Sequence, residues 1–184
     1  LPISIPCCCL LLVLASGSLS NADNNWAQWR GPLNSGVSDS SNPPMTWSET
    51  ENIKWKVAID GNGTSTPIIW EEKVFVLTAV KTSEKDASIP DPKDQPKTNF
   101  FDIKQPNAVH EFLVVCLDRK TGQELWRDIA TKKIPHEGAH NDNDFASASP
   151  TTDGKRLFCW FGSAGLFCYD LDGKDRKSTR LNSS

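Results

Sequence analysis

The sequence has no excess of either charge and no long apolar run. Its 184 residues carry 20 Lys and Arg against 23 Asp and Glu, a formal net charge of -3. Proteins that bind nucleic acid through its phosphates present a clustered basic surface, and no such cluster is evident. Every apolar stretch is shorter than the ~20 residues that cross a bilayer. The composition therefore predicts one ordinary globular domain with no nucleic-acid partner.

The N-terminal segment, residues 1–22, carries no charge. An apolar centre at residues 7–15 is followed by small polar residues ending in Ser20-Asn21-Ala22, a pattern typical of a secretory signal peptide with its cleavage site. We expect a secreted or periplasmic protein of the cell envelope with no membrane span in the mature chain. A membrane anchor is the alternative. Because the segment has neither an initiator Met nor a basic start, we expect it to be N-terminally incomplete.

Cysteine becomes scarce once this leader is set aside. Three of the six cysteines lie at positions 7–9, which leaves Cys116, Cys159 and Cys168 and excludes a disulfide framework. If residues 162–165 form a four-residue hairpin turn, Cys159 faces Cys168 across the hairpin. Cross-strand Cβ atoms lie ~4.5 to 5.5 Å apart, slightly long for a disulfide. Two packed thiols are therefore favoured, with a disulfide as the alternative.

An internal repeat is the most informative pattern. TSTPIIWEEKVFVLTA and SASPTTDGKRLFCWFG align without a gap when Pro67 is placed over Pro150. Further along, VVCLDRKTG at 114–122 matches LFCYDLDG at 166–173, with a turn that is one residue shorter. Self-similarity of this kind is the signature of a repeat architecture.

The repeat also includes a tryptophan. IKWKVAI at 53–59 resembles ELWRDIA at 124–130, which places Trp55 on Trp126. The pattern therefore predicts four short strands in each repeat unit. One follows Ser-x-Pro, two are apolar with the second ending in Asp, and the last carries the Trp.

The connections differ between the two copies. Trp55 to Pro67 spans 12 residues but Trp126 to Pro150 spans 24. Residues 80–110 form an extra stretch in the first copy, with four prolines and balanced charge. A long loop of this kind is usually either functional or disordered. We expect residues 80–110 to be a loop insertion that is disordered or forms a solvated face.

The spacing D-x-x-T-G-x-x-x-W, present as Asp118, Thr121, Gly122 and Trp126, resembles the tryptophan motif of pyrroloquinoline-quinone (PQQ) repeat propellers. The similarity extends over about residues 26–174, and NWAQWRGPLNSGVS resembles the opening of secreted PQQ-like proteins of planctomycete-type bacteria. The resemblance implies an all-β fold, a β-propeller of four-stranded antiparallel blades. The structural residues that it implies, with Trp packed between blades and Asp and Gly making turns, are Trp55, Asp118, Thr121, Gly122, Trp126, Asp170 and Gly173.

The resemblance also implies a domain organisation. Residues 23–52 would form an N-terminal entry segment and residues 53–174 the partial propeller repeats. DRKSTRLNSS at 175–184 has neither the expected Trp nor apolar alternation, so we expect a non-native tail. A propeller needs at least four blades. The chain is therefore expected to be a fragment of about two blades, with one complete blade, the last strand of a preceding one and about three strands of another.

The segment HEGAH at 136–140 satisfies the zinc-protease pattern H-E-x-x-H. That mechanism requires both His on one helical face, but Pro135 precedes the segment and Gly138 interrupts it. We expect a loop on the propeller's face rather than a zinc protease. No catalytic residue is assigned, and the weak metal candidates are His136, His140, Asp142 and Asp144.

Three functions remain open. The first is a non-catalytic secreted or periplasmic scaffold that binds an unknown protein or ligand on the propeller face. The second is a PQQ- and Ca-dependent quinoprotein dehydrogenase. Resemblance to such enzymes implies a disulfide between two adjacent cysteines, on which the cofactor stacks. The only adjacent cysteines lie in the leader, so active-site blades would have to lie outside this fragment. The third is another secreted enzyme that depends on HEGAH. The first is favoured, with no cofactor in this fragment.

Overall fold

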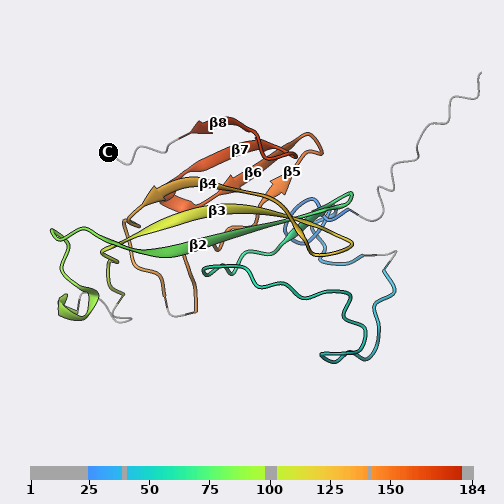
Figure 1. The fold of residues 1–184 in the computed structure, drawn as a ribbon, viewed down its shortest axis with the longest axis horizontal. Coiled ribbons are helices and arrows are strands. Elements are labelled where there is room, and N and C mark those ends of the chain that lie inside the picture. Colours follow the sequence, from blue (N-terminus) through green and yellow to red (C-terminus); the bar gives the residue numbers. More distant parts are fainter. Residues whose placement is uncertain (1–24, 39–40, 98–102, 141, 180–184) are drawn as a thin grey trace, which may run out of the picture.

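The computed structural model describes residues 25–38, 41–97, 103–140 and 142–179, and two antiparallel sheets follow one another along this chain (Figure 1). The described residues form no α-helix, only the short 3-10 helices η2 (Pro92–Asp94) and η3 (Gly162–Ala164). The all-β prediction is confirmed. The two sheets are stacked and are not closed into a ring, and the leader at 1–22 lies outside the described residues.

Sheet A contains β1 (Ile68–Trp70), β2 (Lys73–Lys85), β3 (Ala108–Asp118) and β4 (Glu124–Lys133), hydrogen-bonded in chain order. Its central strands are rich in Val, Leu and Phe, residues suited to a pleated surface that is covered on both faces. Burial agrees, because most residues of β3 are buried while the outer strand β4 has only exposed and partly buried residues.

Sheet B contains β5 (Thr151–Thr152), β6 (Arg156–Trp160), β7 (Leu166–Asp170) and β8 (Asp175–Thr179), again in chain order. Sheet B therefore has four strands rather than the three expected, because residues 175–179 of the expected non-native tail pair with β7. The non-native origin of residues 175–184 stays a prediction. Backbone pairing to the open edge of β7 is sufficient to order this polar segment as a strand.

The two sheets have matching registers. Phe75 lies opposite Cys116 in sheet A, and Phe158 lies opposite Cys168 in sheet B. The register shift that follows Cys116 in the β3–β4 pair recurs after Cys168 in the β7–β8 pair. The repeat predicted from the sequence is therefore confirmed, and the two sheets also share this register shift.

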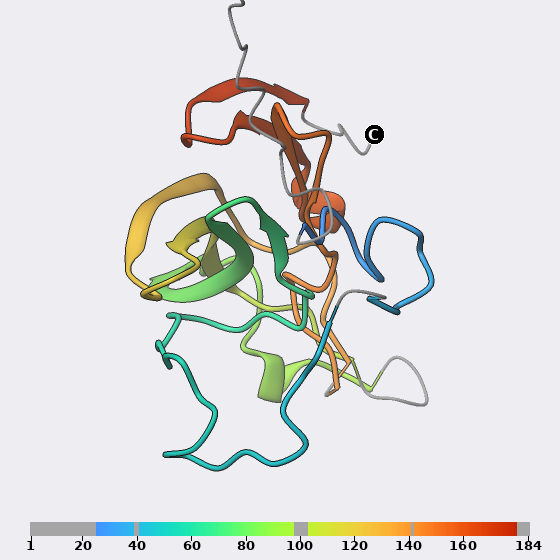
Figure 2. The same ribbon diagram turned by 90° about the vertical axis from the view of Figure 1, so that its right-hand side faces the viewer.

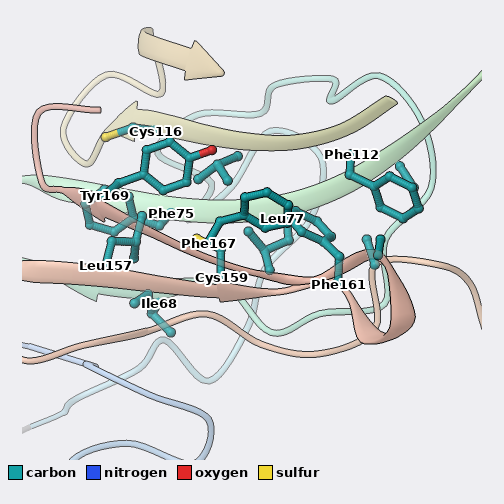
Figure 3. Close-up of a cluster of buried hydrophobic side chains, with 14 residues drawn as sticks. Ile68, Phe75, Leu77, Phe112, Cys116, Leu157, Cys159, Phe161, Phe167 and Tyr169 are labelled. Atoms are coloured by element: carbon teal, nitrogen blue, oxygen red, sulfur yellow. The ribbon is translucent and has the colours of Figure 1, made fainter. Parts of the chain in front are cut away.

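The main core lies between the two sheets (Figure 3). Phe75, Leu77 and Phe112 from sheet A meet Leu157 and Phe161 from sheet B, with all five at most 3% exposed. A second cluster lies on the opposite face of sheet A, where the half-buried residues Trp55 and Ile59 pack against the β2–β3 surface. Sheet A is thus covered on both faces.

The segment that carries Trp55 is not a strand. Residues 53–59 are assigned to no sheet in the described part of the chain, contrary to the prediction from their similarity to β4. Trp55 and Ile59 nevertheless pack against sheet A, although the segment forms no strand pairing. Figure 2 shows the cyan chain ahead of β1 looping away from the sheets.

The region expected as an insertion at 80–110 is partly strand, since β2 continues to Lys85 and β3 begins at Ala108. Between them the described part is largely exposed but hydrogen-bonded. Asp86 N donates to Asn107 O at 2.9 Å, and Asn107 Nδ2 donates to Asp91 Oδ1 at 2.8 Å. The solvated character is therefore right, while disorder does not hold for the described residues.

The segment around Trp26 and Ala27, within the expected entry segment, contacts both sheets. Trp26 and Ile69 exchange two backbone hydrogen bonds of 2.8 and 2.9 Å, which extends sheet A beyond β1. The next residue, Ala27, accepts a hydrogen bond of 2.9 Å from Thr152 N of sheet B. The expected entry segment thus ties the first strands of the two sheets together. Among the described residues, no helix is long and apolar enough to cross a membrane.

Candidate functional site

Trp126 connects the two sheets through a glycine. An added Cβ at Gly173 would lie 2.6 Å from Trp126 Cδ2, so only glycine allows the indole to lie this close. Gly173 also has φ +85°, a backbone conformation that side chains disfavour. Trp126 Nε1 donates to Leu171 O at 3.2 Å, and the ring packs near Phe75 and Tyr169.

Trp55 repeats this geometry one unit earlier. A Cβ at Gly122 would lie 2.6 Å from Trp55 Cδ2, and Gly122 has φ +74°. Trp55 Nε1 donates to Arg119 O at 2.9 Å. In both units the acceptor is the residue that follows the repeat Asp, so the tryptophan of one unit always docks onto the turn of the next.

The aspartates of the repeat shape these turns. Asp118 Oδ1 accepts hydrogen bonds from Thr121 N at 2.7 Å, Thr121 Oγ1 at 2.8 Å and Lys120 N at 2.9 Å. These bonds, led by the Thr121 hydroxyl, lower the pKa of Asp118. Asp170 Oδ1 likewise accepts from Asp172 N and Lys174 N at 3.0 and 2.9 Å. The geometry gives both aspartates the turn-making role that the sequence predicts.

A pocket of about 340 Å³ opens at one end of the inter-sheet core. Three connections meet at this end, since antiparallel order brings the β2–β3, β4–β5 and β6–β7 loops together. The pocket is lined by the β4–β5 loop and by η3 of the β6–β7 loop. Its volume is within the ~300 to 1,000 Å³ typical of small-molecule sites.

The pocket has an aromatic floor and a polar rim. Phe112 and Phe161 meet edge to face at 5.4 Å beneath it, and Phe145 also lines it. The polar lining combines acceptors and donors of several kinds: Lys133, His136, Glu137, His140, Asn143, Asp144, Ser147 and Ser163. Such a lining suits a small ligand with one apolar face and several hydrogen-bonding groups.

Hydrogen bonds hold the β4–β5 loop in place. Asp144 Oδ1 accepts from Ala146 N at 2.8 Å, and Ser65 N donates to Ala146 O at 3.2 Å. Gly138 allows the β2–β3 loop to pass closely, because a Cβ there would lie 2.0 Å from Lys104 O. The β2–β3 loop therefore supports the β4–β5 loop, which forms part of the rim.

The structure places HEGAH in this rim and not on a helix, since residues 136–140 form bends and irregular backbone. The one-face arrangement of the zinc-protease pattern is therefore absent. His136, His140 and Asp144 line the pocket, whereas Asp142 has a 90% exposed side chain that lies 3.4 Å from His140 Nδ1. Within the described residues, no three His, Cys, Asp or Glu side chains converge as metal ligands.

The predicted Cys159–Cys168 pairing is wrong. Trp160 rather than Phe161 lies opposite Leu166, because η3 makes the loop one residue longer than the expected turn. Cys159 consequently faces Phe167, and Cys168 falls on the other side of the sheet. Cys116 and Cys159 are fully buried thiols, and burial raises the pKa of both.

Sequence reasoning missed the floor of the pocket, because Phe112 and Phe161 are 49 positions apart and meet only when the sheets stack. The available signal was the length of the connection between Trp126 and Pro150, twice that of the earlier copy.

No protein-family model matches the chain, and no curated protein is significantly similar to it.

Proposed function

We propose that sheets A and B are consecutive blades of a PQQ-like β-propeller that serves as a non-catalytic, secreted or periplasmic ligand-binding scaffold. Support for the architecture comes from the equal registers of the two sheets and from the Trp-to-Gly docking that joins each unit to the next. A propeller arises when such face-to-face packing of four-stranded sheets continues around an axis.

The observation that carries the binding role is the pocket at the loop end. It combines an aromatic floor with a rim of mixed polar groups, and the rim is held by hydrogen bonds before any ligand arrives. Preorganised loops of this kind bind without a large ordering cost. A scaffold role needs no catalytic group, and none is assigned to the pocket.

The experiment is a calorimetric titration of the full chain with four small probes. These are choline, glucose, indole and the dipeptide Gly-Phe. At least one probe should bind saturably. The variant Ser163→Trp, on the exposed rim, should weaken this binding because a bulky side chain covers the mouth. Lys155→Trp in the β5–β6 turn is the matched control and should leave it unchanged.

The same protein is also assayed with PQQ and Ca²⁺ for alcohol-dependent reduction of a redox dye. We expect no dye reduction. Turnover that requires PQQ would replace the scaffold by the dehydrogenase alternative. The absence of saturable binding by all four probes, or equal effects of the two Trp variants, would contradict the pocket as the binding site.

A further inference from the structure

Lys133, the last residue of β4, lies on the inner face of sheet A at the pocket. It is opposite His110 of β3, as Thr131 is opposite Phe112, and opposed residues of an antiparallel pair share one face of the sheet. Phe112 belongs to the core between the two sheets, so Lys133 is on the same face, and it lines the pocket. The pocket therefore combines a cationic side chain with its aromatic floor.

The ammonium group of Lys133 has no carboxylate partner in the described part of the chain. The preceding residue, Lys132, lies on the opposite face of the strand and pairs with Glu111. Lys133 forms no such ion pair among the described residues, although it is half-buried. Partial burial weakens the hydration of a cation, so a counterion would be favourable here. A ligand carboxylate would supply that counterion.

Asp144 brings the opposite charge into the pocket from the β4–β5 loop. Its Oδ1 atom accepts the hydrogen bond of 2.8 Å from Ala146 N, which orients the carboxylate. Its Oδ2 atom accepts no hydrogen bond from the described residues. Lys133 and Asp144 thus line one pocket without forming an ion pair with each other, and Glu137 adds an exposed carboxylate at the rim. One oxygen of Asp144 is therefore available to a cationic group.

The floor of the pocket offers aromatic contacts to a third kind of group. Figure 3 shows Phe112 and Phe161 at the end of the core that adjoins η3, where their rings meet edge to face. The half-buried Phe145 packs edge to face on the ring of His110 at 4.9 Å and also lines the pocket. Clustered rings favour the addition of another ring. The volume of about 340 Å³ suits a molecule with one ring and a short charged end.

We propose that the pocket binds an aromatic amino acid as its zwitterion. The ligand carboxylate pairs with Lys133, its ammonium group pairs with Asp144, and its ring packs on the phenylalanine floor. A ligand that is only anionic, only cationic or uncharged would leave at least one of the two protein charges without a partner. The inference rests on the proposed binding role of the pocket and specifies the class of ligand.

Calorimetric titration of the full chain with four related probes tests this assignment. Phenylalanine carries all three groups, 3-phenylpropionate lacks the ammonium group, phenethylamine lacks the carboxylate, and alanine lacks the ring. Phenylalanine should bind roughly tenfold or more tightly than each of the other three probes, since a charge-assisted hydrogen bond in a partly buried site contributes at least this factor.

Two variants assign the charged contacts. Lys133→Gln should weaken the binding of phenylalanine without weakening that of phenethylamine, because phenethylamine has no carboxylate. Asp144→Asn, which keeps an acceptor for Ala146 N, should weaken the binding of phenylalanine without weakening that of 3-phenylpropionate. The matched controls are Lys132→Gln, on the opposite face of the strand, and Asp142→Asn, whose side chain is 90% exposed in the same loop. Both controls should bind phenylalanine as the unaltered chain does.

Failure of this inference differs from failure of the proposed function. If choline, glucose, indole or Gly-Phe binds and Ser163→Trp weakens that binding, but phenylalanine does not bind, the pocket is a binding site for another class of ligand. Equal affinities for the four related probes, or equal losses in Lys133→Gln and Lys132→Gln, would also overturn the inference. A chain that binds none of the probes in either titration would contradict both the inference and the proposed function.

Discussion

Trp126 lies directly on Gly173, at a distance that leaves no room for a Cβ. The two residues belong to different sheets and are joined further by the hydrogen bond from Trp126 Nε1 to Leu171 O at 3.2 Å. Lys73 Nζ donates to the same carbonyl at 2.9 Å and pairs with Asp172. One turn of sheet B thus receives two side chains from sheet A, and the packing of the sheets depends on the shape of that turn.

Gly173→Ala should destabilise the chain by about 2 to 5 kcal/mol, since the new methyl group must displace the indole and the left-handed backbone adds strain. Urea unfolding followed by tryptophan fluorescence measures this. Gly162→Ala is a close control, with φ +56° and no atom within 4 Å of the added Cβ. It should cost only the backbone strain, about 1 to 2 kcal/mol. Equal costs would argue against the docking role of Gly173.

Trp126→Ala should lower the free energy of unfolding by about 3 kcal/mol, because the half-buried indole leaves a cavity beside Phe75 and Tyr169. Trp126→Phe keeps an aromatic ring but loses the bond to Leu171 O, and we expect a smaller loss. Both variants are compared with the unaltered chain by urea unfolding. If the alanine variant is as stable as the phenylalanine variant, ring packing is not what joins the sheets.

Acid should destabilise the protein partly through Asp118. Its pKa is lowered in the fold by the Thr121 hydroxyl and by backbone N–H groups, so the unfolded chain binds the proton more readily. This contribution is complete above the ordinary aspartate pKa of about 4 and is lost as the pH falls further, through the folded pKa. In Asp118→Asn, unfolding measured from pH 6 to pH 2 should depend less on pH than in the unaltered chain. An unchanged slope would mean that the turn does not hold the carboxylate.

Cys116 and Cys159 should resist alkylation in the folded protein. Burial raises the pKa of the Cys116 thiol to about 12 and also raises that of Cys159, so the reactive thiolate is scarce at neutral pH. Iodoacetamide labelling with peptide mass mapping should modify both only after urea unfolding. Cys168, which is half-buried, serves as the internal comparison and should react earlier. Native labelling of Cys159 as fast as that of Cys168 would show that the sheets separate readily.

Much of the fold could be predicted from sequence because the repeat is local. Repeated apolar runs followed by turn residues predicted the central strands, and the Asp118 and Gly122 turn could be predicted because its hydrogen bonds lie within a few residues. The errors arose where long-range contacts decided the outcome. Residues 53–59 have the pattern of a strand but no neighbouring strand, and β8 has a polar composition but a free strand edge beside it.

The length of the β6–β7 turn in sheet B is a second feature that could not be predicted from the sequence. The residues between Trp160 and Leu166 are compatible with either of two turn lengths, and η3 selects the longer one. That single residue moves Cys168 to the other face of the sheet. Turn length could not be deduced from spacing alone, because burial of Phe161 against Phe112 of the other sheet favours the observed register.

The sequence by itself determined the all-β class, the four-strand unit and the turns, since these follow from alternation, turn residues and glycine at positive φ. Only the tertiary structure decided which faces are buried, where the pocket lies and which strand edges remain open. Those properties depend on residues far apart in the chain, such as Phe112 and Phe161 beneath the pocket or Trp126 on Gly173, and their contact exists only once one sheet has packed on the other.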